Sequence, residues 1–148
     1  MTEKIGVVTD AEWEIMRMVW SLGQVNSSHL IELVQQKRDW QASTVKTLLG
    51  RLVKKDYLIA TKEGRRFIYT ANIAEDEAMN HATQSLFNQL CGMKKGCTLA
   101  TLIEQTTLSQ NDIQTLQTVL AAKLPSAPTT IECDCLPANC DCIEEEVK

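Results

Sequence analysis

The sequence lacks any apolar stretch that approaches the length of about 18 residues that a membrane-spanning helix requires. Its first residues, Met1 to Lys4, also lack the basic start and apolar run of a secretory signal peptide. We therefore expect a cytoplasmic protein with no membrane partner. Because that compartment keeps thiols reduced, the six cysteines are expected to be thiols rather than disulfides.

The sequence also lacks the residue sets that carry most enzymatic chemistry. It contains no recognisable Ser/His/Asp set, no pair of catalytic carboxylates and no glycine loop that would cradle phosphates. The two histidines, His29 and His81, fall in predicted helices without a second ligand at metal spacing, so we interpret both as structural or solvated. These absences predict a protein that is not an enzyme.

Charge is distributed unevenly along the 148 residues. Residues 1–72 contain 11 Lys/Arg and 8 Asp/Glu, whereas residues 73–148 contain 4 and 11, so the net charge of −4 conceals a basic first half. Nine of the bases fall within residues 37–66. A basic patch inside an acidic protein indicates a local nucleic-acid footprint, although charge alone is equally consistent with a solvated helix face.

The first 72 residues predict three helices followed by a β-hairpin. A capping box from Thr9 to Glu12 begins a helix that ends at Gly23, and Asn26 or Ser27 begins a second helix that runs to about Arg38. A third helix is predicted over residues 42–54. Strand-like runs at 58–62 and 65–70 follow, with a tight turn at residues 63–64. This order is the winged variant of the helix-turn-helix.

The predicted third helix has two chemically different faces. Four apolar side chains at helical spacing face a core: Val45, Leu48, Leu49 and Leu52. The opposite side is polar and basic, as a helix that enters the major groove of DNA requires. Its candidate DNA contacts are Ser43, Thr44, Lys46, Thr47, Arg51 and Lys54. The hairpin adds Lys62, Arg65 and Arg66 as candidate contacts to backbone phosphates.

Residues 73–125 predict short helices that cannot bury much apolar surface alone. Apolar residues recur every four positions from Ala78 to Leu90, Gly residues at 92 and 96 interrupt the pattern, and Ser109 caps a last helix. A second copy of the chain is the favoured partner for these helices, and packing on the chain's own first domain is the alternative. We therefore expect a DNA-binding domain at 1–72, a dimerisation region at 73–125 and a tail at 126–148.

Four cysteines cluster in the tail with the spacing CxC-x4-CxC: Cys133, Cys135, Cys140 and Cys142. The residues between the two pairs can turn, which would bring the four thiols together. Such a set can close a tetrahedral Zn(II) site or hold Cu(I), and spacing alone leaves the metal open. Disulfides and a redox dithiol fit less well. Cys91 and Cys97 lie outside this cluster and are interpreted as small buried or idle thiols rather than a second thiol site. Asp134 and Asp141 either support the cluster or aid solubility.

Residues 40–55 carry a longer motif, W-x-x-x-T-V-x-T-L-L-x-R-L-x-K-K, which resembles the recognition helix of the penicillinase and methicillin-resistance (BlaI/MecI) repressors. The resemblance extends over residue 7 to about 125, and it implies a homodimeric winged-helix repressor on an inverted-repeat operator in double-stranded DNA. The β-lactam-responsive members are inactivated by cleavage at an Asn-Phe bond. Here Phe67 follows Arg66 and Phe87 follows Leu86, so another release mechanism is expected.

The CxC-x4-CxC tail is similar to that of the copper-responsive CopY repressors of this family. This resemblance implies that a Zn(II) form binds the operator, and that Cu(I), delivered by a copper chaperone, displaces zinc and releases DNA. Copper-export genes would then be transcribed, and the protein would be associated with the nucleoid. A zinc- or cadmium-responsive repressor, a thiolate store or carrier for copper, and a redox enzyme remain alternatives.

Overall fold

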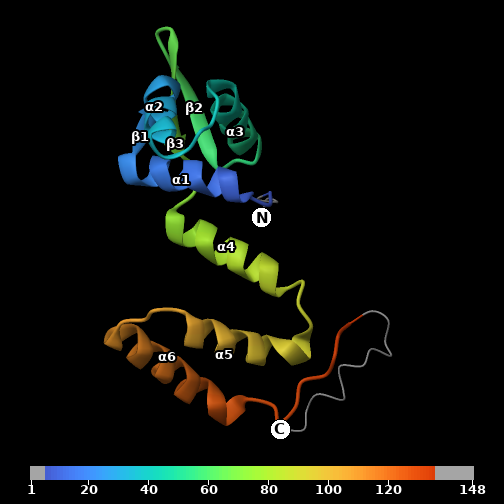
Figure 1. Cartoon of the computed structure of the whole chain (residues 1–148). Helices are drawn as coiled ribbons and strands as arrows, with labels where there is room; N and C mark the ends of the chain where they lie inside the picture. Colours follow the sequence, from blue (N-terminus) through green and yellow to red (C-terminus); the bar gives the residue numbers. More distant parts are fainter. Residues whose placement is uncertain (1–5, 136–148) are drawn as a thin grey trace. The chain divides into compact units, whose positions relative to one another are not determined.

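The computed structural model describes residues 6–135, and the chain divides into two compact units, Met1–Gln84 and Ser85–Lys148 (Figure 1). The first unit contains, in chain order, α1 (Asp10–Leu22), β1 (Gln24–Asn26), α2 (Ser27–Lys37), α3 (Ala42–Lys54), β2 (Leu58–Glu63) and β3 (Arg66–Ala71). The boundary between the units falls within α4 (Glu75–Phe87). The second unit continues with the short 3₁₀ helix η1 (Gly92–Lys94), α5 (Lys95–Gln105), α6 (Gln110–Lys123) and η2 (Leu124–Ser126).

The predicted winged helix-turn-helix, mainly α-helical with a small β-hairpin, is confirmed. Thr9 caps α1 through a complete capping box with Glu12, and Asn26 caps α2 by accepting a hydrogen bond of 2.8 Å from the His29 amide. Gly23 ends α1 with φ 81°, which glycine adopts without steric cost. Among the described residues, no helix is long and apolar enough to cross a membrane.

The sheet differs from the prediction in two details. A third strand, β1, pairs antiparallel with β3 through Val25 and Tyr69, so the strand order is β1-β3-β2. Three residues between two helices are too few to show strand periodicity in the sequence. The hairpin turn lies one residue later than predicted, at 64–65, because Glu63 pairs with Arg66 across the strands.

The prediction that Gly96 interrupts the helical pattern is wrong. It lies near the start of α5, and a Cβ at this position would meet nothing within 4 Å. The interruption between α4 and α5 is confined to residues 88–94, where η1 replaces α-helix.

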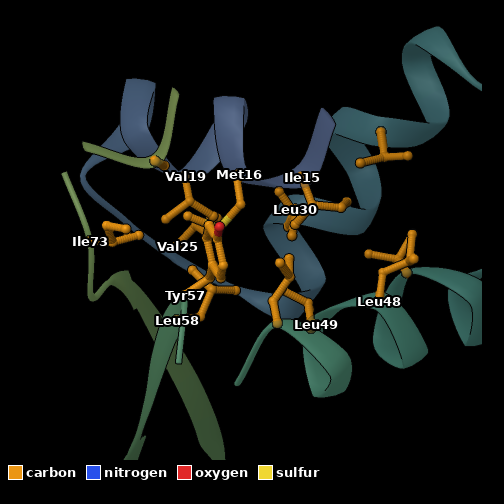
Figure 2. Packing of buried hydrophobic residues seen from close by; sticks show 14 residues of the cluster. Ile15, Met16, Val19, Val25, Leu30, Leu48, Leu49, Tyr57, Leu58 and Ile73 are labelled. Atoms are coloured by element: carbon orange, nitrogen blue, oxygen red, sulfur yellow. The ribbon is translucent and has the colours of Figure 1, made fainter. Parts of the chain in front are cut away.

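The hydrophobic core belongs to the first unit and includes side chains from α1, α2, α3 and the sheet (Figure 2). Its fully buried members include Ile15, Met16, Leu30, Leu49 and Leu52. Trp20 packs against this core and donates a hydrogen bond of 2.9 Å from Nε1 to the Ile73 carbonyl. The link after β3 is therefore held against α1.

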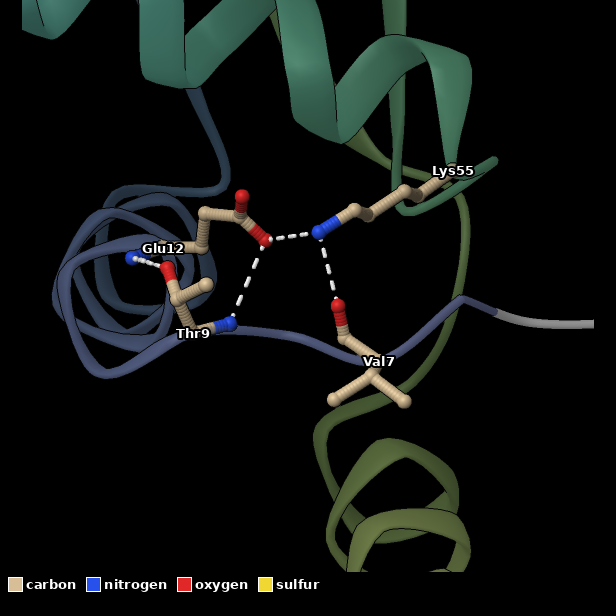
Figure 3. A network of polar contacts seen from close by, with 4 residues as sticks. All are labelled: Val7, Thr9, Glu12 and Lys55. Carbon is tan, nitrogen blue, oxygen red and sulfur yellow. Dashed lines mark hydrogen bonds and ion pairs between the residues drawn. The ribbon is translucent and has the colours of Figure 1, made fainter.

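A buried ion pair joins α1 to the end of α3 (Figure 3). The Glu12 side chain is 0% exposed and accepts from Lys55 Nζ at 2.7 Å and from the Thr9 amide at 3.3 Å. Lys55 Nζ also donates to the Val7 carbonyl at 2.7 Å. A buried carboxylate without a cation is costly, so this contact ties the helix ends together.

We expect Lys55→Met to lower the free energy of unfolding by about 2–3 kcal/mol, because it leaves the Glu12 carboxylate buried without its cation. Urea denaturation measures this loss. The matched control is Arg38→Met, which breaks the exposed Arg38–Glu14 pair of 2.6 Å. That pair should contribute about 1 kcal/mol or less. Equal losses in the two variants would contradict the account of the buried pair.

Candidate DNA-binding surface and thiol cluster

The two faces of α3 are separated as the sequence pattern predicts. Val45, Leu49 and Leu52 are 0% exposed, and Leu48 is 5% exposed. The six candidate DNA contacts on this helix are all exposed: Ser43, Thr44, Lys46, Thr47, Arg51 and Lys54. The inward side chains thereby hold the basic face outward, toward where a DNA groove would lie.

Contacts around the connection between α2 and α3 fix the position of α3. The Arg38 guanidinium donates to both carboxylate oxygens of Glu14 on α1, at 3.0 and 2.6 Å. Gln35 Nε2 donates to the Trp40 carbonyl at 3.2 Å, and the Trp40 ring packs against the core. The connection is therefore tied to both preceding helices, which holds the start of α3 in place.

The hairpin forms the wing. β1 pairs with β3 only from residue 68 onward, so the hairpin tip, residues 61–67, has no third strand beside it and is exposed (Figure 1). Gly64 has φ 64° in the two-residue turn. The three predicted basic residues are exposed on this tip, with Arg65 in the turn and Lys62 and Arg66 on the strands. Long cationic side chains placed in this way suit backbone phosphates.

Three cysteine sulfurs meet in the second unit. The Sγ atoms of Cys91, Cys133 and Cys135 all lie within 4.8 Å of one another, and all three residues are half-buried. Cys91 therefore lies beside the first CxC pair of the tail and not outside the cluster, contrary to the prediction, because nothing in the local spacing of Cys91 indicates its distant neighbours. Cys97 is exposed on α5. Cys140, Cys142 and Asp141 lie outside the described residues.

Asp134 attaches the first CxC pair to the segment that contains Cys91. Its Oδ1 accepts a hydrogen bond of 2.7 Å from the Gly92 amide. This bond and the nearby Lys95 ammonium hold the pKa of the Asp134 carboxyl below its ordinary value, so the side chain is ionised at neutral pH. The Cys135 amide lies 3.4 Å from Cys133 Sγ and donates a hydrogen bond to it.

The sulfur geometry fits a soft metal ion. Cys91 Sγ and Cys133 Sγ are 3.7 Å apart, far beyond an S–S bond of about 2.05 Å. Two ligands of a tetrahedral zinc ion, each about 2.3 Å from it, are separated by about 3.8 Å. Thiolates are the ligands preferred by Zn(II) and Cu(I). Cys133 and Cys135 are close enough to bind one ion, and their role as metal ligands stays a prediction.

A helix-turn-helix with an exposed basic third helix and a basic wing defines the class of DNA-binding transcriptional regulators. The family described as Penicillinase repressor matches residues 8–122, and the chain belongs to this family. The family consists of DNA-binding transcriptional repressors and not of enzymes. The matched region ends before the cysteines of the tail.

Two relatives and one solved structure illustrate the similarity. An uncharacterized 16.5 kDa protein of Latilactobacillus sakei, from the ptsI 3′ region, is 64% identical over 99% of this chain and its own full length. The penicillinase repressor of Bacillus licheniformis is 31% identical over 80% of this chain and 92% of its own. The DNA-binding domain of the repressor BlaI shares 38% identity over 51% of this chain and 93% of that domain, with a TM-score of 0.48.

Substitutions on the two elements should weaken DNA binding in different ways. The operator is a duplex that the wild-type protein selects from random sequences. Lys46→Ala or Arg51→Ala should each weaken the free energy of binding to this operator by about 1–3 kcal/mol and relax the sequence preference at one base pair. Arg66→Ala should weaken binding to all DNA sequences, because it removes a contact to a backbone phosphate. It should also reduce the steepness of the plot of log affinity against log salt concentration by about 0.9. Arg17→Ala, an exposed cation on α1, is the control. Unchanged affinity in both α3 variants would refute the role of this face.

Proposed function

We propose that this protein is a copper-responsive transcriptional repressor whose cysteine tail exchanges Zn(II) for Cu(I). The observation that carries the proposal is a cluster of thiols with metal-ligand spacing in a chain of a DNA-binding repressor family. The tail's CxC-x4-CxC spacing resembles that of copper-responsive members, which supports copper as the signal. The sequence contains no Asn-Phe bond, so the proposed release does not involve cleavage of such a bond.

In this proposal α3 enters the major groove of the operator. The Lys and Arg side chains on its exposed face would bind phosphates or guanine edges, and the hydroxyls would bind phosphates or base edges. The wing would place Lys62, Arg65 and Arg66 on the neighbouring backbone. Residues 1–72 would act as the DNA-binding domain and residues 126–148 as the metal-binding tail.

A homodimer on an inverted repeat is part of the same proposal, with residues 73–125 as the dimerisation region. None of the residues that the structure describes in α5 and α6 is buried. Large apolar side chains remain exposed there, among them Leu99, Leu102, Ile113, Leu120 and Leu124. Helices with this much exposed apolar surface need a partner, and a second copy presents the same surface. Sedimentation as a monomer at micromolar concentration would contradict this part.

The switch depends on the coordination that the tail thiolates offer. Cys133, Cys135, Cys140 and Cys142 would hold Zn(II) through their thiolates, and this would bring the two CxC pairs together. The same thiolates bind Cu(I) more favourably and in a different geometry, so they would give up zinc when a copper chaperone delivers copper. The two arrangements must make different contacts with the rest of the protein, because only such a difference can alter DNA affinity.

Release of the operator would allow transcription of copper-export genes. A repressor that works in this way acts in the cytoplasm, on the nucleoid. A zinc- or cadmium-responsive repressor would share the DNA-binding surface but would be released by those ions. A thiolate copper store would bind Cu(I) without a sequence-specific DNA complex.

The double variant Cys140→Ser/Cys142→Ser should lose release of the operator by Cu(I), because two of the proposed ligands are gone. Fluorescence anisotropy with a labelled operator measures the effect in the presence of one to four equivalents of Cu(I). The matched control, Cys97→Ser, removes an exposed thiol of α5 and should still release DNA. A double variant that releases DNA as wild type does would remove the tail from the mechanism.

A further inference from the structure

We propose that Cys91 is a ligand of the metal centre together with the tail cysteines, so that bound metal fastens the tail to the start of α5. This inference rests on the proposed function, since it assumes that the tail binds metal. It adds a fifth candidate thiol to a set of which a tetrahedral zinc ion binds four, and it specifies which part of the second unit senses occupancy. The CxC-x4-CxC spacing does not include this residue.

The distances favour direct ligation over mere proximity. Cys91 Sγ lies 3.7 Å from Cys133 Sγ, and Cys91, Cys133 and Cys135 together form a group whose sulfurs are all within 4.8 Å. The first distance is close to the separation of about 3.8 Å between two sulfurs on one tetrahedral zinc ion. Three half-buried sulfurs from segments about 40 residues apart in sequence have therefore converged, and small adjustments would place all three around one ion.

Asp134 and Gly92 explain why the tail meets the chain at this point. The Asp134 carboxylate accepts from the Gly92 amide, so each partner of this bond is a direct neighbour of a clustered cysteine. A Cβ at Gly92 would come within 3.3 Å of Asp134 Oδ1, a contact tighter than usual. Glycine therefore leaves room for the carboxylate. We assign Asp134 as a positioning residue that brings the first CxC pair to Cys91.

The connection gives the metal a route to the proposed dimerisation region. Cys91 immediately precedes η1, which leads directly into α5. Metal that binds Cys91 and the tail would therefore fix the tail against the start of α5. Exchange of one metal for another would change the sulfur geometry at the end of a helix with an exposed apolar face. Binding also displaces the thiol protons, because the thiolate is the form that ligates.

Alkylation of the full-length protein tests the assignment directly. Metal-free and zinc-loaded protein are treated with iodoacetamide, and peptides are quantified by mass spectrometry. Trypsin cleaves at Lys94 and Lys95, so Cys91 and Cys97 fall on different peptides. Zinc should slow alkylation of Cys91 at least about tenfold, together with the tail cysteines, because a metal-bound thiolate is not available as a nucleophile. Cys97 should react at the same rate in both samples.

Affinity measurements then separate ligation from shielding. Competition with a chromophoric chelator should show zinc affinity reduced at least about tenfold by Cys91→Ser, since loss of groups that only support ligands already costs about 10–100-fold. Cys97→Ser should leave affinity unchanged. Asp134→Ala should weaken zinc binding, whereas Glu132→Ala, an exposed neighbour, should not.

The outcomes distinguish this inference from the proposed function. If zinc protects the tail cysteines but either leaves Cys91 unprotected or binds Cys91→Ser as tightly as wild type, ligation by Cys91 is refuted and the tail site stands. If zinc protects none of the cysteines, the metal centre of the proposed function fails as well.

Discussion

The burial of one face of α3 is the constraint on which the DNA-binding surface depends. Val45, Leu48, Leu49 and Leu52 fill the space against α1 and α2, and each such side chain stabilises the fold by about 1.5–3 kcal/mol. Rotation of the helix would expose this apolar set, so the opposite face is held outward. The pair between Glu12 and Lys55 ties the end of α3 to the beginning of α1. The candidate DNA contacts on α3 are therefore held in place by the buried core beneath them.

The described residues of the second unit, 85–135, form no comparable core. None of the described residues after Ala78 is buried, although α5 and α6 carry many large apolar side chains. Its order must come from other sources, and two are present in the chain's own residues: an apolar surface suited to a second copy, and a thiol cluster suited to a metal ion. A region without a packed core has low local stability, so metal binding can change its structure more than it could change the structure of the first unit.

Most of the first unit could be predicted from the sequence, because each helix has a capping signal or a periodic apolar face. The range of α3 and its four inward residues were predicted correctly. β1 was missed because three residues show no strand pattern, and the hairpin turn was placed one residue early because glycine suits either turn position. The proximity of Cys91 to Cys133 and Cys135 could not be predicted, because these residues are about 40 positions away in the sequence and no local spacing indicates that they meet. Cys140 and Cys142 stay predictions from spacing.

We propose that the metal held by the tail thiolates decides whether the protein binds DNA. This dependence is tested most directly by the operator affinity of the full-length wild-type protein with zinc, with Cu(I) and without metal, at one salt concentration. We expect tight binding with zinc and an affinity at least about tenfold lower with Cu(I), a difference of about 1.4 kcal/mol or more. Equal affinity of the zinc-loaded and copper-loaded proteins would contradict it.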